Sequence, residues 1–193
     1  MDYKKEVMRA IFHIATGLVI VILSLFMAIK NLITLLSIII ILGLVISIIS
    51  KRTKLPVISQ FLGTFEREES RDFPGRGSFY FVAGCFFALL LFEKQIALAS
   101  IMVLTFGDSF TNIFGPLGKI KTRLHARKRL EGTILGIAAG TLAAMWFVTP
   151  VQAFFGTLIA MIGEMIDFKY LQINDNVFVP IVAGIFMKLL KGF

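Results

Sequence analysis

Long apolar segments recur along the whole chain, and they constrain its fold more than any other feature. Short polar or basic stretches separate seven such segments. They cover residues 9–29, 32–49, 78–92, 95–113, 132–149, 151–166 and 177–190. A helix needs about 20 apolar residues to cross about 30 Å of hydrocarbon. We therefore expect an all-α, polytopic integral membrane bundle of about seven transmembrane helices, with the shorter ones tilted or partly sunken.

The composition excludes a soluble domain. Hydrophobic residues make up 57% of the 193 residues, and the mean hydropathy is +0.86. Values this high are typical of membrane proteins. We expect one transmembrane domain, residues 1–193, with cytoplasmic loops at 50–77, 114–131 and 167–176. The single Cys85 lies inside an apolar segment, so no intramolecular disulfide can form.

The basic residues predict the orientation of these segments. Only Lys30, Lys94, Lys188 and Lys191 fall on one side of the expected bundle, so the other sixteen of the 20 Lys and Arg residues share the opposite side. Positive charge accumulates on the cytoplasmic side of membrane proteins, which places the N-terminus there. The net charge of +8 thus orients helices and attracts anionic head groups or nucleotides, and we expect no nucleic-acid partner.

Asp108 is the most costly polar residue in the apolar segments. At about 1.5 Å per residue it lies roughly 20 Å along its helix from Gln95. An Asp at the centre of a bilayer costs about 2.5–3.5 kcal/mol, which makes an intramembrane carboxylate a functional candidate. Asn112 and Gly115, four and seven residues later, fall on the same helical face. The alternative is a carboxylate at the water interface.

A basic stretch follows Asp108 and favours phosphate binding. The turn Gly115-Pro116-Leu117-Gly118 can expose backbone N–H groups to a phosphate, and a second acid, Glu131, precedes Gly132 and Thr133. The cationic candidates are Lys119, Lys121, Arg127 and Lys128. Such basic residues are also topology determinants, and an acid in the first turn of a helix is stabilised by the macrodipole.

Further oxygen ligands lie on the same expected side. Glu164 and Asp167 are three residues apart, and the cluster Asn174-Asp175-Asn176 follows after a short loop. Oxygen ligands of this kind suit Mg²⁺, which commonly binds through one or two carboxylates together with substrate phosphates. Clusters of Asn and Asp are also frequent turn formers, which is the alternative interpretation.

Small residues recur at helical spacing in two segments. Gly132, Gly136 and Gly140 are four residues apart, and Ala153, Gly156, Ala160 and Gly163 follow the same period in the next segment. Small faces let membrane helices approach closely, so we expect packing surfaces there.

Two further residues are added to the candidate site. His13 lies four residues after Arg9 and four before Gly17, at the expected cytoplasmic end of the first helix. Arg76 ends the loop 50–77 on the same side. A lone His is more often a packed side chain than a catalytic one.

Taken in order, these residues resemble the family of CTP-dependent lipid-alcohol kinases, which comprises dolichol (polyprenol) kinase, phytol kinase and CTP-dependent diacylglycerol kinase. The matching residues are Glu6, Arg9, His13, Gly17, Gly77, Gly107-Asp108, Gly115, Gly118, Lys128, Glu131-Gly132-Thr133, Glu164, Asn174-Asp175-Asn176 and Pro180. The Lys-Thr or Lys-Ser pair that usually precedes Glu-Gly-Thr reads Arg129-Leu130 here, so that hydroxyl is missing.

The resemblance implies transfer of the γ-phosphoryl group of CTP to the hydroxyl of a long-chain isoprenoid alcohol or related lipid at the cytoplasmic membrane face. It implies that Asp108 and Asp175 are catalytic and bind Mg²⁺ with Asn174 and Asn176. The basic residues would neutralise phosphates, because phosphoryl transfer needs positioning and charge neutralisation. Glu131, Gly132 and Thr133 would shape the nucleotide pocket. The short chain suggests a prokaryotic plasma membrane, and it is compatible with a homo-oligomer.

Two other functions stay open. A CTP:phosphatidate cytidylyltransferase has a similar region after its Asp, but that family ends in a Lys-Asp and Pro-Gly-His-Gly-Gly signature where this chain reads Asn-Asp-Asn and then Pro180. The difference favours the kinase. A small membrane transporter could use intramembrane acids as a cation path, and it should show inverted repeats or broken helices.

Overall fold

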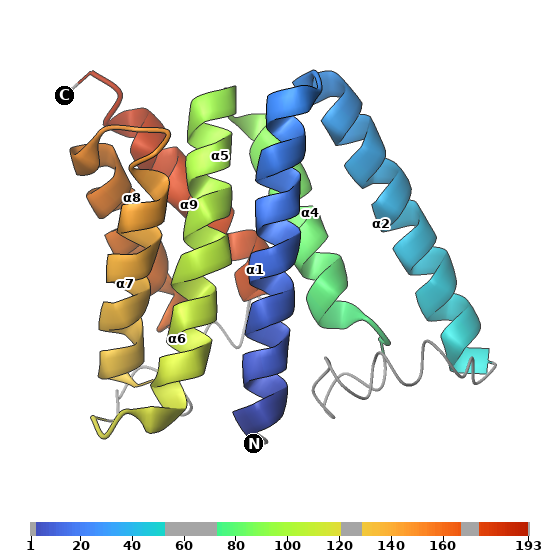
Figure 1. The fold of residues 1–193 in the computed structure, drawn as a ribbon, viewed down its shortest axis with the longest axis horizontal. Coiled ribbons are helices and arrows are strands. Elements are labelled where there is room, and N and C mark those ends of the chain that lie inside the picture. Colours follow the sequence, from blue (N-terminus) through green and yellow to red (C-terminus); the bar gives the residue numbers. More distant parts are fainter. Residues whose placement is uncertain (1–2, 53–72, 121–128, 167–173, 193) are drawn as a thin grey trace.

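The described residues of the chain, 3–52, 73–120, 129–166 and 174–192, are almost entirely helical in a computed structural model (Figure 1). The helices are α1 (Tyr3–Phe26), α2 (Ile29–Arg52), α4 (Arg76–Leu91), α5 (Lys94–Met102), α6 (Ser109–Phe114), α7 (Leu130–Ala144), α8 (Pro150–Glu164) and α9 (Asp175–Leu189). A π-helical turn, η2 (Val103–Asp108), joins α5 to α6, and a 3₁₀ turn, η3 (Gly115–Leu117), follows α6. The expected all-helical fold is confirmed.

Each of the seven expected apolar segments is a helix. The fourth is a continuous rod, Lys94–Leu117, made of α5, η2, α6 and η3, which we call the central rod. Three stretches of the described chain are long and apolar enough to cross a membrane: Tyr3–Phe26, Ile29–Ser50 and the central rod. Helices α4, α7 and α8 are apolar but shorter. A helix of that length crosses a bilayer only with local adjustment.

The rods run up and down between two ends of the bundle. Figure 1 shows the N-terminus at the lower end, together with the ends of α2, α6 and α8 and the starts of α4, α7 and α9. The C-terminus lies at the upper end. The described elements that carry the predicted site residues therefore begin or end at the lower side of the bundle.

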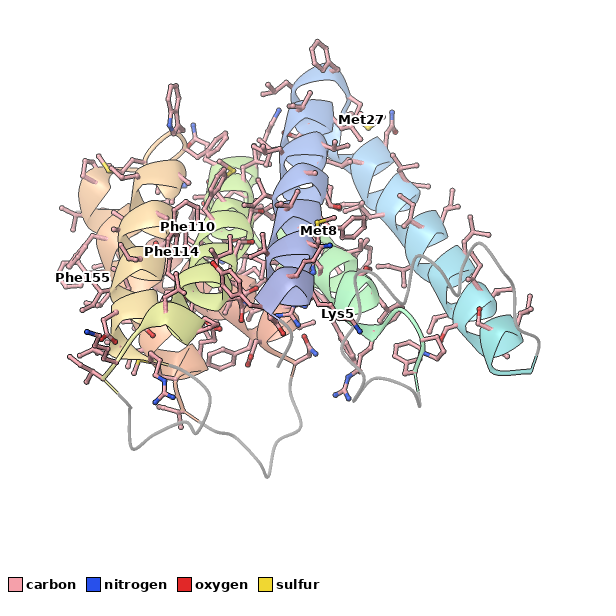
Figure 2. All side chains as sticks on the ribbon, turned by 60° about the horizontal axis from the view of Figure 1, so that its bottom comes forward. Lys5, Met8, Met27, Phe110, Phe114 and Phe155 are labelled. Carbon is pink, nitrogen blue, oxygen red and sulfur yellow. The ribbon has the colours of Figure 1, made fainter. Side chains whose placement is uncertain are left out.

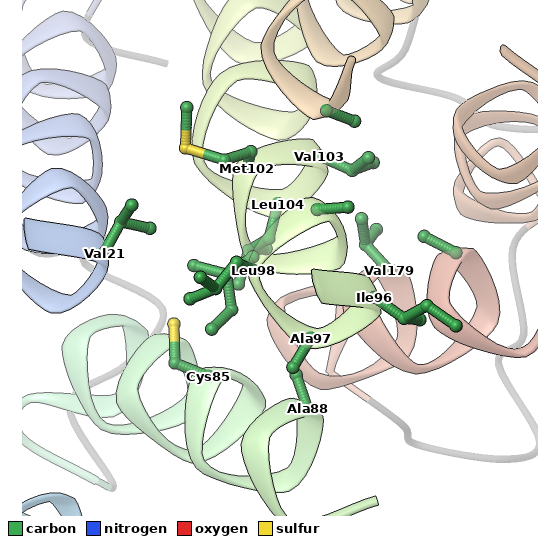
Figure 3. Packing of buried hydrophobic residues seen from close by; sticks show 14 of the residues in the cluster. Val21, Cys85, Ala88, Ile96, Ala97, Leu98, Met102, Val103, Leu104 and Val179 are labelled. Atoms are coloured by element: carbon green, nitrogen blue, oxygen red, sulfur yellow. The ribbon is translucent and has the colours of Figure 1, made fainter. Parts of the chain in front are cut away.

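The central rod is the most enclosed part of the structure. Of its apolar stretch, 78% is buried, against 33% for α1 and 17% for α2. Figure 3 shows Leu98 and Leu104 of the rod packed among Val21 of α1, Cys85 of α4 and Val179 of α9. A polar group near the lower end of this rod is thus shielded by neighbouring helices, whereas much of α2 is exposed apolar surface.

The boundary between α7 and α8 lies at Pro150, as predicted. The side chain of Thr149 accepts a hydrogen bond from the N–H of Gln152, and Gln152 Oε1 accepts one from the N–H of Thr149 at 3.1 Å. This reciprocal capping box, with Pro at the first helical position, starts α8. The expected segment 132–149 was wrong at its end, because α7 stops at Ala144 and turns lead to the cap.

Both small-residue faces are packing surfaces, as expected. A Cβ atom on Gly132 would lie 2.5 Å from the Cα of Gly115, and one on Gly136 would lie 2.6 Å from the carbonyl oxygen of Gly107. In α8, a Cβ on Gly156 would lie 2.7 Å from Met187 Cγ. Close approach of this kind supplies the packing that holds helices together in lipid. It also fixes α7 against the part of the rod that carries Asp108.

Candidate functional site

Asp108 is the last residue of the π-helical turn and is 4% exposed. Single π turns inside α-helices often occur at functional sites, because they disturb the regular hydrogen-bond ladder. The side chain of Asn112 donates a hydrogen bond to the carbonyl oxygen of Asp108 at 2.9 Å. The predicted carboxylate and amide are therefore neighbours, but the amide is engaged with the backbone.

His13 lies beside Asp108, across the interface between α1 and the central rod. Its Nδ1 is 3.9 Å from Asp108 Oδ2, and its ring stacks on Phe81 of α4, with centroids 4.5 Å apart. This separation is longer than a direct hydrogen bond. His13 is 2% exposed, and its Nε2 has no hydrogen-bond partner among the described residues. Three helices thus converge on a buried carboxylate and imidazole.

The N-terminal residues of the resemblance share one face of α1, and that face packs on the central rod. Glu6 and Arg9 form an ion pair of 2.8 Å one to two turns below His13, with the Glu6 side chain 3% exposed. Ser109 Oγ donates to the carbonyl oxygen of Ala10 at 3.4 Å. Gly17, one turn above His13, leaves room for Thr105. Because this interface has a low dielectric constant, the attraction between Glu6 and Arg9 is stronger than it would be in water.

Glu131 closes the turn that was expected to bind phosphate. Its carboxylate accepts hydrogen bonds from the N–H groups of Lys119 at 2.7 Å and Ile120 at 3.0 Å. Hydrogen bonds from its own N–H and from that of Lys119 lower the pKa of the Glu131 carboxyl. The turn does bind an anion, as backbone N–H groups in such concavities do. That anion is the chain's own carboxylate, and the Lys119 side chain beside it is exposed.

Glycines predicted for nucleotide binding also have a packing role. Gly115 and Gly132 lie against each other where η3 meets α7, and a Cβ on Gly118 would lie 2.6 Å from Glu131 Oε2. Thr133 is 2% exposed, and its hydroxyl donates to the carbonyl oxygen of Arg129 at 3.4 Å. These residues therefore shape the lower end of the rod by close approach.

The cluster Asn174-Asp175-Asn176 starts α9, which agrees with its interpretation as a turn. The side chain of Asn174 accepts from the N–H of Asn176 at 3.1 Å and so caps the helix. The amide of Asn176 donates to the carbonyl oxygen of Gly77 at 3.2 Å and ties α9 to α4. Asp175 is exposed in the first turn. Both Asn side chains thus have structural roles at the start of α9.

The other candidates lie around this end. Glu164 is 3% exposed at the last residue of α8, and Arg76 is exposed at the first residue of α4. Lys121, Arg127, Lys128 and Asp167 lie outside the described residues. Within the described ranges, no three His, Cys, Asp or Glu side chains converge so as to hold a metal ion. Asp108 and Asp175, the two predicted Mg²⁺ ligands, lie on different elements: Asp108 is buried in the central rod, and Asp175 is exposed at the start of α9.

Some residues of the site were missed by sequence reasoning. Thr105 and Ser109 are four residues apart on the helix that carries Asp108, so their shared face was a usable signal. Phe81 gave none, because an aromatic residue in an apolar segment is indistinguishable from core.

Comparisons with known proteins add one relative. No family model matches the chain, and no solved structure matches it. The chain is similar to the uncharacterized protein MJ1137 of Methanocaldococcus jannaschii, with 28% identity over 183 residues. The match covers 93% of this chain and 91% of that protein. The similarity therefore extends over nearly the whole of both chains, and the name of the relative states no activity.

Proposed function

We propose that the chain is a CTP-dependent lipid kinase, built as a seven-span membrane bundle with its N-terminus in the cytoplasm. It transfers the γ-phosphoryl group of CTP to the hydroxyl of a long-chain isoprenoid alcohol or a related lipid. The observation that carries the proposal is Asp108, a carboxylate buried at a π turn of the central rod with the His13 imidazole beside it. A carboxylate at such a cost inside an apolar helix is retained for function.

The position of Asp108 suits a reaction between a nucleotide and a lipid. It lies seven residues above Gly115, so about 10 Å of helix separates it from the end of α6. Glu131, Lys119, Asp175 and Arg76 belong to the same lower end of the bundle. A water-soluble nucleotide can approach from that end while a lipid approaches through the apolar sides.

The distribution of charge supports the orientation. Lys30, Lys94 and Lys191 belong to the upper end, where Lys191 pairs with Glu93 and Lys94 donates to the carbonyl oxygen of Ser24 at 2.8 Å. The richer basic content of the lower end favours the cytoplasmic side, where nucleotides are available.

The residues would divide the work of phosphoryl transfer. Asp108 would hold Mg²⁺ jointly with phosphate oxygens, and the metal would supply positive charge to the phosphates. His13 keeps the Asp108 carboxylate in one orientation from the Nδ1 side. Lys119, exposed beside the Glu131 turn, attracts the nucleotide phosphates. Because such a reaction depends on positioning and charge neutralisation, these roles are sufficient without a covalent intermediate.

The test is an assay of the purified protein with Mg²⁺ and CTP labelled separately at its α- and γ-phosphates. The acceptors are polyprenol, geranylgeraniol, diacylglycerol and phosphatidate. We expect γ-label in the lipid fraction and release of CDP. Incorporation of the α-label would replace the kinase with a cytidylyltransferase. Incorporation of neither label from CTP, ATP or GTP would contradict a transferase and favour a transporter.

A further inference from the structure

A concave site lies on the side of α4 that faces away from His13. It is a groove between α2, α4 and the start of α9 that encloses about 330 Å³, and we call it the α2–α4 groove. Its walls include Ile40 of α2, Phe79 and Phe87 of α4 and Val177 of α9. Pockets for small ligands begin at about 300 Å³ and are mostly apolar with a few polar groups. The groove is therefore large enough to hold part of a ligand.

The groove is separate from the Asp108 site. Phe79, Ala83 and Phe86 lie on one face of α4, at the spacing of successive helical turns. Phe81 lies on nearly the opposite face, where it is fully buried and stacks on His13. Helix α4 thus stands between the two sites, and a ligand in the groove does not contact Asp108 through this helix.

The outer wall of the groove is α2, which leans away from the bundle toward its lower end (Figure 1). It faces α4 through Gly43, where an added Cβ would lie 3.9 Å from Phe79. The side of α2 turned away from α4 is exposed apolar surface, with Ile41 59% and Ile48 58% exposed. In a membrane this surface contacts lipid chains, so α2 separates the groove from the surrounding hydrocarbon by the width of one helix.

The polar groups of the groove lie toward its lower end. Tyr80 and Asn174 contribute the polar side chains of its lining. The guanidinium of Arg76, exposed one turn below Tyr80, lies over the Tyr80 ring at 5.8 Å from its centroid. An apolar groove that leads to a cationic end is complementary to a chain that ends in an anion.

We propose that the α2–α4 groove binds one hydrocarbon chain of an anionic glycerophospholipid, with the lipid phosphate at Arg76. The chain lies along Phe79, Ala83 and Phe87, and the phosphate accepts charge-assisted hydrogen bonds from the guanidinium. This site is additional to the proposed kinase function and does not depend on it. It is a site for a membrane lipid that is neither acceptor nor product.

The test is photo-crosslinking of the full-length protein in phosphatidylcholine vesicles. The probe is phosphatidylglycerol with a diazirine in one acyl chain, and crosslinked peptides are mapped by mass spectrometry. The comparison probes are phosphatidylcholine with the same chain and a long-chain alcohol with the same diazirine. We expect phosphatidylglycerol to label residues of α2 and α4 that line the groove, about fivefold more than phosphatidylcholine does.

Matched variants locate the chain and the head group. Ala83→Phe fills the groove and should abolish labelling there, whereas Ala138→Phe, at an exposed position of α7, should not change it. Arg76→Gln should reduce labelling by phosphatidylglycerol to the phosphatidylcholine level. Arg76→Lys should retain part of the preference, and Lys4→Gln at the same end should retain all of it.

Three results would overturn the proposal. Equal labelling of the groove by phosphatidylglycerol and phosphatidylcholine would contradict the proposed preference for an anionic head group. Displacement of phosphatidylglycerol by the long-chain alcohol would assign the groove to the acceptor instead. Undiminished labelling in both Ala83→Phe and Ile40→Phe would place the lipid elsewhere. Gel filtration and far-UV circular dichroism show whether each variant is folded, and the charge variants test the site independently of the filling ones.

Discussion

At the scale of single residues, the candidate site consists of a carboxylate and an imidazole, and burying these polar groups costs free energy. Asp108 and His13 are 4% and 2% exposed, and each has its partner on a different helix. Burying polar groups without interaction costs several kcal/mol, which explains why they are close to each other. Asp108 could be predicted from the sequence, because an acid in an apolar segment is conspicuous. The pairing with His13 could not, because 95 positions separate the two residues in the chain.

His13→Phe should separate packing from positioning. Phe keeps an aromatic ring against Phe81 but has no Nδ1 to face Asp108. We expect the melting temperature to stay close to that of the wild type and kcat to fall roughly 10- to 100-fold, as for other residues that orient a metal ligand. Steady-state kinetics with CTP and thermal unfolding in detergent measure both. A wild-type kcat would show that His13 only packs.

Glu131 gives a prediction for pH. Because its pKa is lowered in the folded chain, its ionised form stabilises the turn above the ordinary carboxyl pKa, and this contribution is lost as pH falls through the lowered value. We expect the amides of Lys119 and Ile120 to lose protection from hydrogen exchange in that acid range, relative to the intrinsic rate. In Glu131→Gln the protection should be weak throughout and lack this step. A step of the same size in the variant would contradict the role of Glu131.

At the scale of elements, the sequence predicted helices well and their interactions less well. The apolar segments gave all seven helical rods, and Pro150 gave the break between α7 and α8. The π turn before Asp108 has no sequence signal, since it depends on how α7 and α1 pack on the rod. The stripe beginning at Gly132 was predicted to pack, and the same glycine was also assigned to the nucleotide. In the structure, a Cβ atom added to Gly132 would lie only 2.5 Å from the Cα of Gly115, so this glycine is required for packing.

Gly132→Ala should therefore destabilise the fold. The new methyl group meets backbone atoms of η3, which cannot move aside as a flexible side chain would. We expect a loss of about 1–3 kcal/mol, typical of overpacking. Ala138→Leu, a larger change at an exposed position of the same helix, serves as the control and should have little effect. Unfolding in a denaturing detergent compares them, and equal stability of the two variants would refute close packing at Gly132.

At the scale of the whole molecule, the chain gathers its candidate residues at one end of the bundle. The N-terminus, the starts of α4, α7 and α9 and the ends of α2, α6 and α8 meet there (Figure 1). Counting Lys and Arg predicted this grouping, because each pass reverses the side of the chain and alternate connections therefore share one side. The count could not predict which helix occupies the centre. The central position of the rod depends on packing among helices that are far apart in the sequence. Figure 2 shows Met27 near the top of the view and Lys5 well below it, at opposite ends of α1.

The orientation can be measured with single cysteines, because the native Cys85 is completely buried. Lys119→Cys at the lower end should react with a membrane-impermeant maleimide only when the cytoplasmic face is accessible, as in inverted vesicles. Lys30→Cys at the upper end should react only in intact cells stripped of their outer layers. Reaction of the two positions from the same side would exclude the proposed topology. Reaction of Lys119→Cys from outside and of Lys30→Cys from inside would show that the orientation is reversed.

The most direct test of the account compares the wild type with Asp108→Asn in the transfer of γ-labelled phosphate from CTP to polyprenol, with the other lipid alcohols as parallel acceptors. The substitution keeps the shape of the buried side chain and removes its charge, so the protein should insert and fold while transfer falls at least about 100-fold. Glu93→Gln, which removes an exposed carboxylate at the upper end, should transfer phosphate like the wild type. Wild-type transfer by Asp108→Asn would contradict the assignment of the site.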